Sequence, residues 1–482
     1  MKKEIVRFEN VTRQEEGATY LDNFSFYICE GEILGLVSVN DRGKSELLKL
    51  LARNLPIDFG RIYFEGQLVN SYLNSDYSDN KVYTIDQKSS LIQDLSIADN
   101  IFVMRPGFRK YVINEAVLME QALRVFKELS FDINLNQRVS RLSTMERIIV
   151  EAAKAYLMGC RLLILLSPEK IISQADYEKF HQFLLKLKKL NVASLYICYH
   201  HWIMFEVCDR IALFSSGRIK RIFEKQDFNQ DSFAPYVLSF EGYKAYRCQV
   251  AGEPVFQLDS LSCTAIRHLN LSAGPGECIT LLDSDNQVTD ELLHILTGVE
   301  TDYEGRILCQ RRDIRKQKGD CLDRGMIILD DNPTETFLFQ EMSYLENLSF
   351  LLDRKLKRSV LKSAFIHSVR NEYYQEAGDL VDERHIGGMT LREKYGLVYN
   401  KISLFHPKIL IIKKPFAYGD MRCRNYILER LKALKESGIS ILLLTNYITD
   451  CLYLSDRIEV IKNGQNIVSL HPEEYGIISR IF

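Results

Sequence analysis

An internal repeat is the feature that most constrains how this chain folds. Four segments of the first half recur in the second half, each about 245–247 positions later. The matching segments are Gly31-Glu32 with Gly276-Glu277, residues 97–102 with 344–349, Pro168 with Pro415, and Asp209–Gly217 with Asp456–Gly464. Spacing this constant along half of the chain indicates two homologous domains in tandem. We expect the first domain over residues 1–240 and the second over 250–482, with the join between 227 and 253.

The order of apolar segments is the same in both halves and predicts an α/β fold. Two buried strands are predicted in each half, at residues 161–166 and 193–198 and at 408–412 and 439–444. Helix-rich segments precede them, over roughly 103–140 and 351–388. Strands that alternate with helices predict a mostly parallel sheet with helices on both faces.

Composition excludes several classes of partner and location. The formal net charge of the 482 residues is −2, which favours neither nucleic acid nor an anionic lipid surface. The apolar runs are too short to cross a bilayer, and the first residues resemble a strand rather than a signal peptide. The 11 cysteines include no C-x-x-C pair, which is typical of reduced thiols in the cytoplasm. We therefore expect a cytoplasmic protein without direct membrane insertion.

The residues Gly43-Lys44-Ser45 lie between an apolar run, 31–37, and a helical pattern, 46–52. Strand, tight loop and helix is the setting of a phosphate-binding loop, in which backbone N–H groups, the helix dipole and a lysine hold phosphate oxygens. The complete pattern has glycine six residues before the lysine, where this chain has Ser38. Asp41 adds a carboxylate that would oppose phosphate. On its own, the motif is better explained as a chance sequence in a strand-to-helix turn.

Several further segments resemble one family. They are Asp86-Gln87 with 91–102, Leu142–Glu146 with 148–154, residues 205–210, 324–331 and 342–347. Together with the repeat, they resemble the tandem ATP-binding-cassette ATPases of ribose- and galactose-type simple-sugar importers. The resemblance covers nearly the whole chain. It implies two P-loop NTPase domains, each with a mostly parallel sheet and flanking helices, an N-terminal antiparallel β-subdomain and a helical subdomain.

The resemblance implies ATP as the ligand of the first loop. The residues that it assigns to nucleotide are Ser38, Val39, Asn40, Asp41, Arg42, Gly43, Lys44, Ser45 and Gln87. The hydroxyl of Ser45 would be a weak ligand for Mg²⁺. The segment at the position of the family's signature motif is Leu142, Ser143, Thr144, Met145 and Glu146. Glu15 takes the position of the adenine-stacking aromatic, and the nearest aromatic, Tyr20, is expected within a strand.

The family's catalytic groups are missing at the positions that the resemblance assigns to them. The strand before Pro168 should end in an Asp that serves magnesium and a Glu that orients the attacking water. The degenerate positions are Leu166, Ser167 and Tyr199 in the first half and Lys413, Lys414 and Asn446 in the second. Tyr199 and Asn446 replace the switch histidine, although a shift of one residue would place His200 there. No intact catalytic residue is expected, and the role of magnesium is doubtful.

The second loop departs further from the phosphate-binding pattern. Residues 283–290 take its place, with Thr289 at the lysine position and Asp290 at the hydroxyl position. Its three carboxylates should repel a triphosphate. In the family, each site also combines the loop of one half with the signature of the other. Lys44 would therefore face 389–393, where Leu391 and Arg392 replace glycines.

The substitutions in the second half predict an internal ion pair. Asp290 and Lys413 fall on two positions that serve one magnesium ion in the family, so an Asp290–Lys413 pair, shared with Asp283 or Lys414, could replace the metal. Removing one partner would cost about 3–5 kcal/mol if both charges were deeply buried. The alternative is that drift left unrelated charges facing solvent.

Four functional hypotheses follow. The first is an importer subunit that binds ATP weakly at the first cassette, has lost hydrolysis, and assembles with membrane permease subunits or other cassette subunits. It would lie in the cytoplasm or at the inner face of the cell membrane. The second is a regulatory or scaffolding pseudo-ATPase outside transport. The third is a working ATPase whose catalytic groups lie elsewhere. The fourth, a tandem cassette of the translation-factor type, is disfavoured by the near-neutral charge and the absence of a long charged linker.

Overall fold

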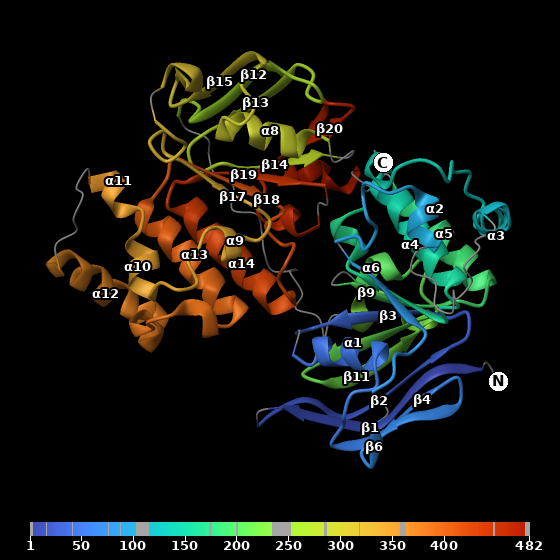
Figure 1. Cartoon of the computed structure of the whole chain (residues 1–482). Helices are drawn as coiled ribbons and strands as arrows, with labels where there is room; N and C mark the ends of the chain where they lie inside the picture. Colours follow the sequence, from blue (N-terminus) through green and yellow to red (C-terminus); the bar gives the residue numbers. More distant parts are fainter. Residues whose placement is uncertain are drawn as a thin grey trace. The chain divides into compact units, whose positions relative to one another are not determined.

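The fold was determined as a computed structural model. It describes residues 3–15, 17–40, 42–75, 77–86, 88–102, 115–172, 176–198, 201–233, 252–283, 287–317, 319–356, 363–446 and 449–477. The chain forms two compact units, one of residues 1–172 and 176–238 and the other of 173–175 and 239–482. Figure 1 shows the first unit in blue to green and the second in yellow to red.

The first unit contains an antiparallel sheet and a mostly parallel one. The antiparallel sheet has the order β2 (Ala18–Cys29), β1 (Glu4–Glu15), β4 (Phe59–Phe64), β5 (Gln67–Ser71) and β6 (Asn74–Ser75). The second sheet has the order β11 (Arg218–Glu224), β10 (Arg210–Ser215), β3 (Ile33–Ser38), β9 (Ala193–Cys198), β8 (Leu162–Leu166) and β7 (Val82–Ile85), with only β11 antiparallel. Its helices are α1 (Lys44–Ala52), α2 (Ile97–Phe102), α3 (Glu115–Glu128), α4 (Thr144–Leu157), α5 (Tyr177–Lys189), α6 (His201–Met204) and α7 (Gln230–Phe233).

The second unit repeats this plan. Its antiparallel sheet has the order β13 (Leu269–Ala273), β12 (Phe256–Ser262), β15 (Glu304–Cys309) and β16 (Arg312–Asp313). Its mostly parallel sheet has the order β17 (Met326–Leu329), β18 (Ile409–Lys413), β19 (Ser440–Thr445), β14 (Cys278–Asp283), β20 (Arg457–Lys462) and β21 (Gln465–Leu470). Its helices are α8 (Val288–Thr297), α9 (Pro333–Thr336), α10 (Tyr344–Ser349), α11 (Leu352–Leu356), α12 (Ser363–Ala377), α13 (Leu391–Phe405) and α14 (Met421–Glu436).

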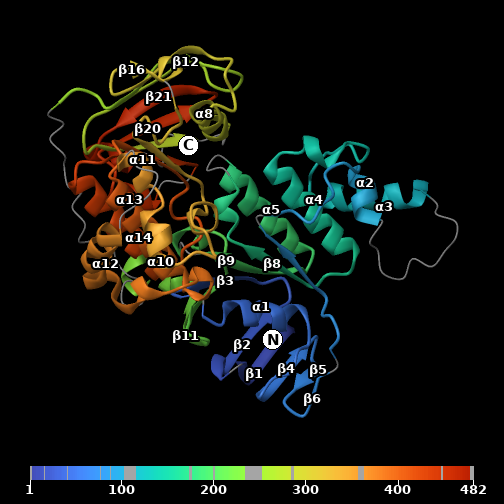
Figure 2. The same cartoon turned by 60° about the vertical axis from the view of Figure 1, so that its left-hand side comes forward.

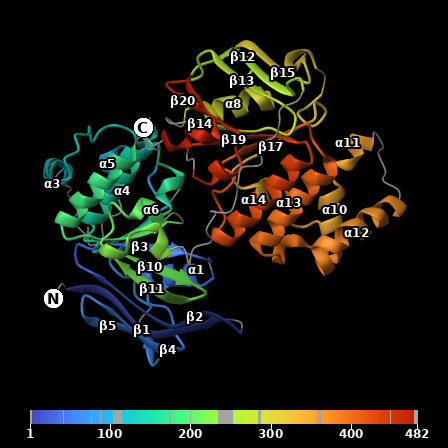
Figure 3. The ribbon, with the colours of Figure 1, turned by 180° about the vertical axis from the view of Figure 1, so that it is seen from behind.

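One helix lies between the two sheets of each unit. In the first unit, α1 buries Leu47, Leu50 and Leu51 in a core that strands of both sheets share. Figure 2 shows α1 between β3 of one sheet and β1 and β2 of the other. In the second unit, α8 buries Leu292 and Leu296 in a similar shared core. Figure 3 shows α8 between β12 and β13 of one sheet and β14 and β19 of the other. Both helices are amphipathic. The apolar stripe of each helix packs into a single core to which both sheets contribute. The loop before each helix is thereby fixed at the carboxyl end of a central strand.

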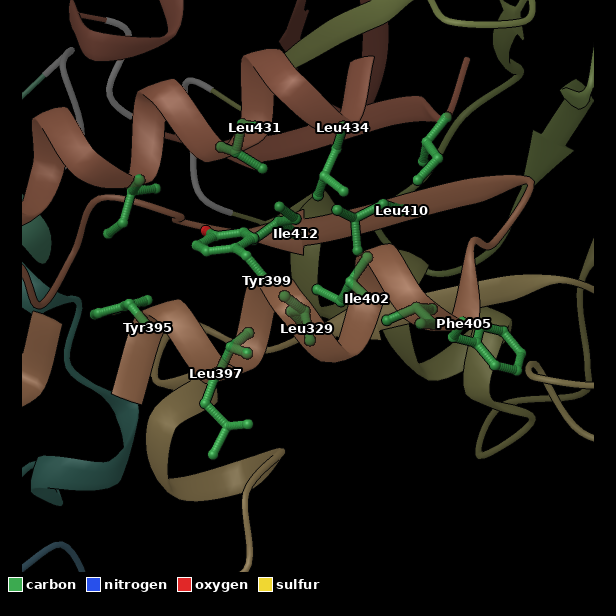
Figure 4. Close-up of a cluster of buried hydrophobic side chains, with 14 of the residues drawn as sticks. Leu329, Tyr395, Leu397, Tyr399, Ile402, Phe405, Leu410, Ile412, Leu431 and Leu434 are labelled. Atoms are coloured by element: carbon green, nitrogen blue, oxygen red, sulfur yellow. The ribbon is translucent and has the colours of Figure 1, made fainter. Parts of the chain in front are cut away.

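The other face of the second unit's parallel sheet is covered by α13 and α14. Figure 4 shows Tyr399 and Ile402 of α13 with Leu410 and Ile412 of β18 and with Leu431 of α14. The strand is apolar on both faces because it is covered on both faces.

The two units also share an ion pair next to the central strand of the parallel sheet. Lys188 pairs with Asp209 in the first unit, and Lys435 pairs with Asp456 at 2.7 Å in the second. Each aspartate also accepts a hydrogen bond from the backbone N–H that begins the central strand, at Ile33 or Cys278. Equivalent contacts at equivalent spacing confirm the predicted α/β fold with two cassettes in tandem.

Candidate functional site

The first loop joins β3 to α1 and contains most of the residues assigned to nucleotide. Ser38 ends the strand, Gly43 precedes the helix, and Lys44 and Ser45 form its first turn. Lys44 is half-buried, whereas Arg42 and Ser45 are exposed. Asp41, predicted to lie in this loop, falls outside the described residues, and so does Gln87.

The middle of the loop is tied to the turn between β10 and β11. The amide nitrogen of Asn40 donates to the hydroxyls of Ser215 and Ser216 at 3.1 and 3.0 Å, and its oxygen accepts from the N–H of Ser216. The N–H of Val39 donates to the carbonyl of Phe214. Asn40 and Val39 therefore hold the loop in place, a structural role that the motif alone did not reveal.

Gly43 adopts a left-handed conformation, with φ of 86°. A Cβ atom at this position would lie 2.0 Å from the carbonyl oxygen of Tyr20, which lies in β2 as predicted. Both the backbone angle and the close approach exclude a side chain. The fold itself therefore requires this glycine, whether or not a nucleotide binds.

An anion fits the first loop. Among the described residues, no side chain caps α1 at Gly43, and the positive end of a helix dipole favours an anionic ligand. The hydroxyl of Ser38 is 1% exposed and has no hydrogen-bond partner among the described residues, which is costly for a buried polar group. A phosphate oxygen would accept a hydrogen bond from the Ser38 hydroxyl.

The strand ends before Pro168 and Pro415 keep the same backbone in both units. Ser167 and Lys414 both adopt left-handed conformations, with φ of 47° and 44°. The register that assigns Leu166 and Ser167 to one acid pair, and Lys413 and Lys414 to the other, is thus the same in the two units. The two strand ends share this backbone conformation, and neither carries an acidic side chain at these positions.

A carboxylate close to the first strand end was not anticipated. Glu169 lies two residues after Ser167 in the turn that Pro168 begins, and its side chain is buried. Since it is the nearest acidic residue along the chain, it is the one to test in any search for residual hydrolysis.

In the second loop, a buried carboxylate forms hydrogen bonds with the start of the helix that follows. Asp283 ends β14 and is 1% exposed. Its Oδ2 accepts hydrogen bonds from the N–H groups of Val288 and Thr289, at 2.8 and 2.9 Å, and from the Thr289 hydroxyl at 3.1 Å. Residues 284–286 lie outside the described residues. The carboxylate expected to repel phosphate is thus hydrogen-bonded to the start of α8.

The predicted ion pair between Asp290 and Lys413 is present. The Lys413 Nζ lies 2.8 Å from Oδ1 of Asp290 and 3.6 Å from Oδ1 of Asp330. Among the described residues, the second carboxylate within ion-pair distance of Lys413 is therefore that of Asp330, and not that of Asp283, which the sequence had suggested. Burial opposes the charge of Lys413, but the hydrogen bond and the charge of Asp290 outweigh it, so its pKa is raised.

The neighbouring residues share this electrostatic environment. Burial lowers the pKa of Lys414, and the charge of Lys413 lowers it further. Burial and the charge of Asp330 raise the pKa of Asp331. The cluster thus contains both lysines at the positions where the resemblance predicts two acids.

The pair should show a modest coupling. Lys413 is 20% exposed but Asp290 is 63% exposed, so the deep burial that would make a lost partner cost 3–5 kcal/mol is not met for the carboxylate. We expect a coupling free energy of about 1 kcal/mol. Urea unfolding of Lys413→Met, Asp290→Asn and the double variant measures it. Additive losses would mean that the pair does not contribute.

The segment at the signature position forms a helix cap. The Ser143 hydroxyl accepts from the N–H of Glu146, and the Glu146 carboxylate accepts from the N–H of Ser143 at 2.7 Å. Thr390 and Glu393 make the same reciprocal pair at the start of α13. Leu142 and Met145 are buried, and Thr144 is half-buried as the first residue of α4. A capping box therefore accounts for Ser143 and Glu146 without a ligand.

Other assigned positions lie at strand ends or outside the described residues. Asn446 follows β19 and is buried. Tyr199 and His200 fall outside the described residues, and so does the side chain of His201. Within the described ranges, no group of three or more His, Cys, Asp or Glu side chains could hold a metal ion. No helix among the described segments is long and apolar enough to span a membrane.

Comparison with known proteins agrees with the geometry. Residues 21–168 match the ABC transporter family. The chain is 23% identical over 479 residues to a ribose import ATP-binding protein of Caldanaerobacter subterraneus, covering 98% of this chain and 97% of the relative. It is 20% identical over 479 residues to a galactose/methyl galactoside import ATP-binding protein of Haemophilus influenzae, covering 96% and 93%. The predicted resemblance to tandem cassette ATPases of sugar import is confirmed.

A solved structure shares the fold over the whole chain. It is the archaeal ribosome recycling factor aABCE1, crystallised with the ribosomal stalk protein aP1. The TM-score is 0.59 at 15% identity, covering 98% of this chain and 92% of that one. At this identity the likeness concerns the fold alone.

Proposed function

We propose that this tandem ATP-binding-cassette protein is a cytoplasmic subunit of a simple-sugar import system that binds ATP at its first loop and does not hydrolyse it. Similarity along the whole chain to ribose and galactose import ATP-binding proteins supports the transport assignment. The observation that carries the loss of hydrolysis is the pair of strand ends. Both strand ends have the same left-handed backbone, and Leu166, Ser167, Lys413 and Lys414 stand at the positions that the resemblance assigns to acids.

The first loop would bind ATP through its phosphates. The N–H groups at the start of α1, the ammonium group of Lys44 and the buried hydroxyl of Ser38 would contact phosphate oxygens, with Val39, Asn40 and Gly43 shaping the loop. Bound ATP would supply a polyanion to this loop. Magnesium fits less well, because Leu166 and Ser167 offer no carboxylate and only the Ser45 hydroxyl stands at the ligand position. Binding should then rest mainly on lysine and backbone donors.

The affinity for ATP should depend little on Mg²⁺. We expect isothermal titration calorimetry to detect one ATP per chain, with nearly the same affinity with Mg²⁺ and with EDTA, because no strand-end acid holds the ion. Lys44→Ala should abolish the signal by removing the ammonium group that pairs with the phosphates. A strong dependence on Mg²⁺ would mean that a carboxylate elsewhere in the first unit coordinates the ion.

The proposed partners are membrane permease subunits, or other cassette subunits that bind the same permease. The tagged chain, purified from detergent-solubilised membranes of its source, should recover an integral membrane protein that mass spectrometry identifies. Recovery from the soluble fraction alone would contradict the transport role.

A regulatory or scaffolding role outside transport is the second candidate. The ion cluster around Lys413 favours it, because a loop held by internal charges has no need of nucleotide to keep its shape. Co-purification with a soluble regulator in place of a permease would support this role.

A further inference from the structure

The first and second loops carry different residues at one equivalent position of the repeat, and the hydrogen bonding of these two residues also differs. Ser38 ends β3 and Asp283 ends β14, 245 positions later, and both strands lead into a helix between the two sheets. Ser38 carries a short hydroxyl without a partner. Asp283 carries a carboxylate that makes three hydrogen bonds.

The carboxylate of Asp283 sits where an external anion would bind. Val288 and Thr289 are the first residues of α8, so their N–H groups have no partner within the helix and point toward any anion at its start. Asp283 accepts from both and is almost fully buried. A phosphate oxygen would need the same donors and would meet a buried negative charge.

An internal cation completes the arrangement. The ammonium group of Lys413 contacts Asp290 of α8 and Asp330, which follows β17. The helix and two strand ends are thereby joined around one positive charge. The chain thus supplies both an anion, Asp283, and a cation, Lys413, to the surroundings of the second loop.

We propose that the second loop is occupied by the chain's own side chains, with the Asp283 carboxylate in place of a phosphate and the Lys413 ammonium in place of the metal ion that accompanies it. The residue at the end of the central strand, Ser38 or Asp283, decides whether a loop accepts a phosphate. The part of this inference that concerns Ser38 rests on the proposed function of the first loop, whereas the part that concerns Asp283 does not.

The decisive test replaces Asp283 by the residue that the first unit has there. Asp283→Ser should lower the melting temperature of the full-length protein by several degrees, because two N–H groups and the Thr289 hydroxyl lose their acceptor. Millimolar inorganic phosphate should then recover part of that loss, while leaving the unchanged protein nearly unaffected. Asp302→Ser, which removes an exposed carboxylate of the same unit, is the control and should show neither effect.

Two results would overturn the inference. Unchanged stability of Asp283→Ser would show that the carboxylate does not hold the loop. A loss that phosphate does not reverse would show that Asp283 is only a helix cap and that its site does not accept a phosphate.

The reciprocal variant tests the first loop. Ser38→Asp should reduce ATP affinity by about tenfold or more, while the neutral Ser38→Asn, of similar size, should reduce it much less. Equal losses for the two variants would mean that size and not charge decides, which contradicts the proposed role of this position. If the unchanged protein bound no ATP at all, the proposed function would fail, and the Asp283→Ser experiment would still decide the inference about the second loop.

Discussion

Phosphate release from ATP should be no faster with the purified protein than with its Lys44→Ala variant. Hydrolysis requires a carboxylate that orients the attacking water and another that serves the metal, and both strand ends lack them. Loss of a positioned base alone typically costs about 10²–10⁴ in rate. A coupled assay of phosphate release, run at high protein concentration, measures the difference.

Glu169 provides the sharpest control for this experiment. It is the buried carboxylate nearest in sequence to the first strand end. Release that exceeds the Lys44→Ala background and disappears in Glu169→Gln would identify Glu169 as the missing acid and contradict the proposal. Release that depends on Lys44 but not on Glu169 would equally contradict it and place the base elsewhere.

Gly43→Ala should destabilise the first unit by about 3 kcal/mol. The left-handed backbone costs an alanine about 1 kcal/mol. Moving the Tyr20 carbonyl away from a new Cβ atom, which would lie 2.0 Å from it, adds about 1–3 kcal/mol. The midpoint of urea unfolding, followed by circular dichroism without nucleotide, measures the change.

A matched glycine separates the two contributions. Gly159 has nearly the same backbone, with φ of 80°, but no described atom would lie within 4 Å of its Cβ. Gly159→Ala should therefore cost only about 1 kcal/mol. Equal losses for Gly43→Ala and Gly159→Ala would mean that the close approach to Tyr20 does not constrain the loop.

The destabilisation of Gly43→Ala would also change how the motif is interpreted. A glycine that the fold requires in the absence of ligand is no evidence for nucleotide binding. Of the first loop's features, the buried hydroxyl of Ser38 then carries the argument for an anion. Calorimetry on the unchanged protein remains the direct measurement.

Much of the fold could be predicted from the sequence. The constant spacing of the repeat indicated two similar units, and the apolar segments at 161–166, 193–198, 408–412 and 439–444 correspond to β8, β9, β18 and β19. The helix after Gly43 begins at Lys44, close to the predicted 46–52. These predictions succeeded because periodicity and repeat spacing are local properties of the chain.

Part of the candidate site could also be predicted. The pairing of Asp290 with Lys413 followed from two positions known to lie together in a resembling family, and the 2.8 Å contact confirms it. The strength of the pair could not be predicted, because it depends on the exposure of each charge. The side chain of Asp290 proved to be mostly exposed and that of Lys413 mostly buried.

The sequence by itself determined the repeat, the two α/β units and the absence of acids at both strand ends, since each depends on which residue stands at which position. Only the tertiary structure decided what Asp283 does. In the sequence it is a carboxylate that should repel phosphate, and it lies too far before α8 to fit an N-cap pattern. In the structure, its carboxylate accepts hydrogen bonds from the N–H groups of Val288 and Thr289. The partner of a buried charge is set by the path of the backbone around it, and that path is fixed by the packing of α8 between two sheets.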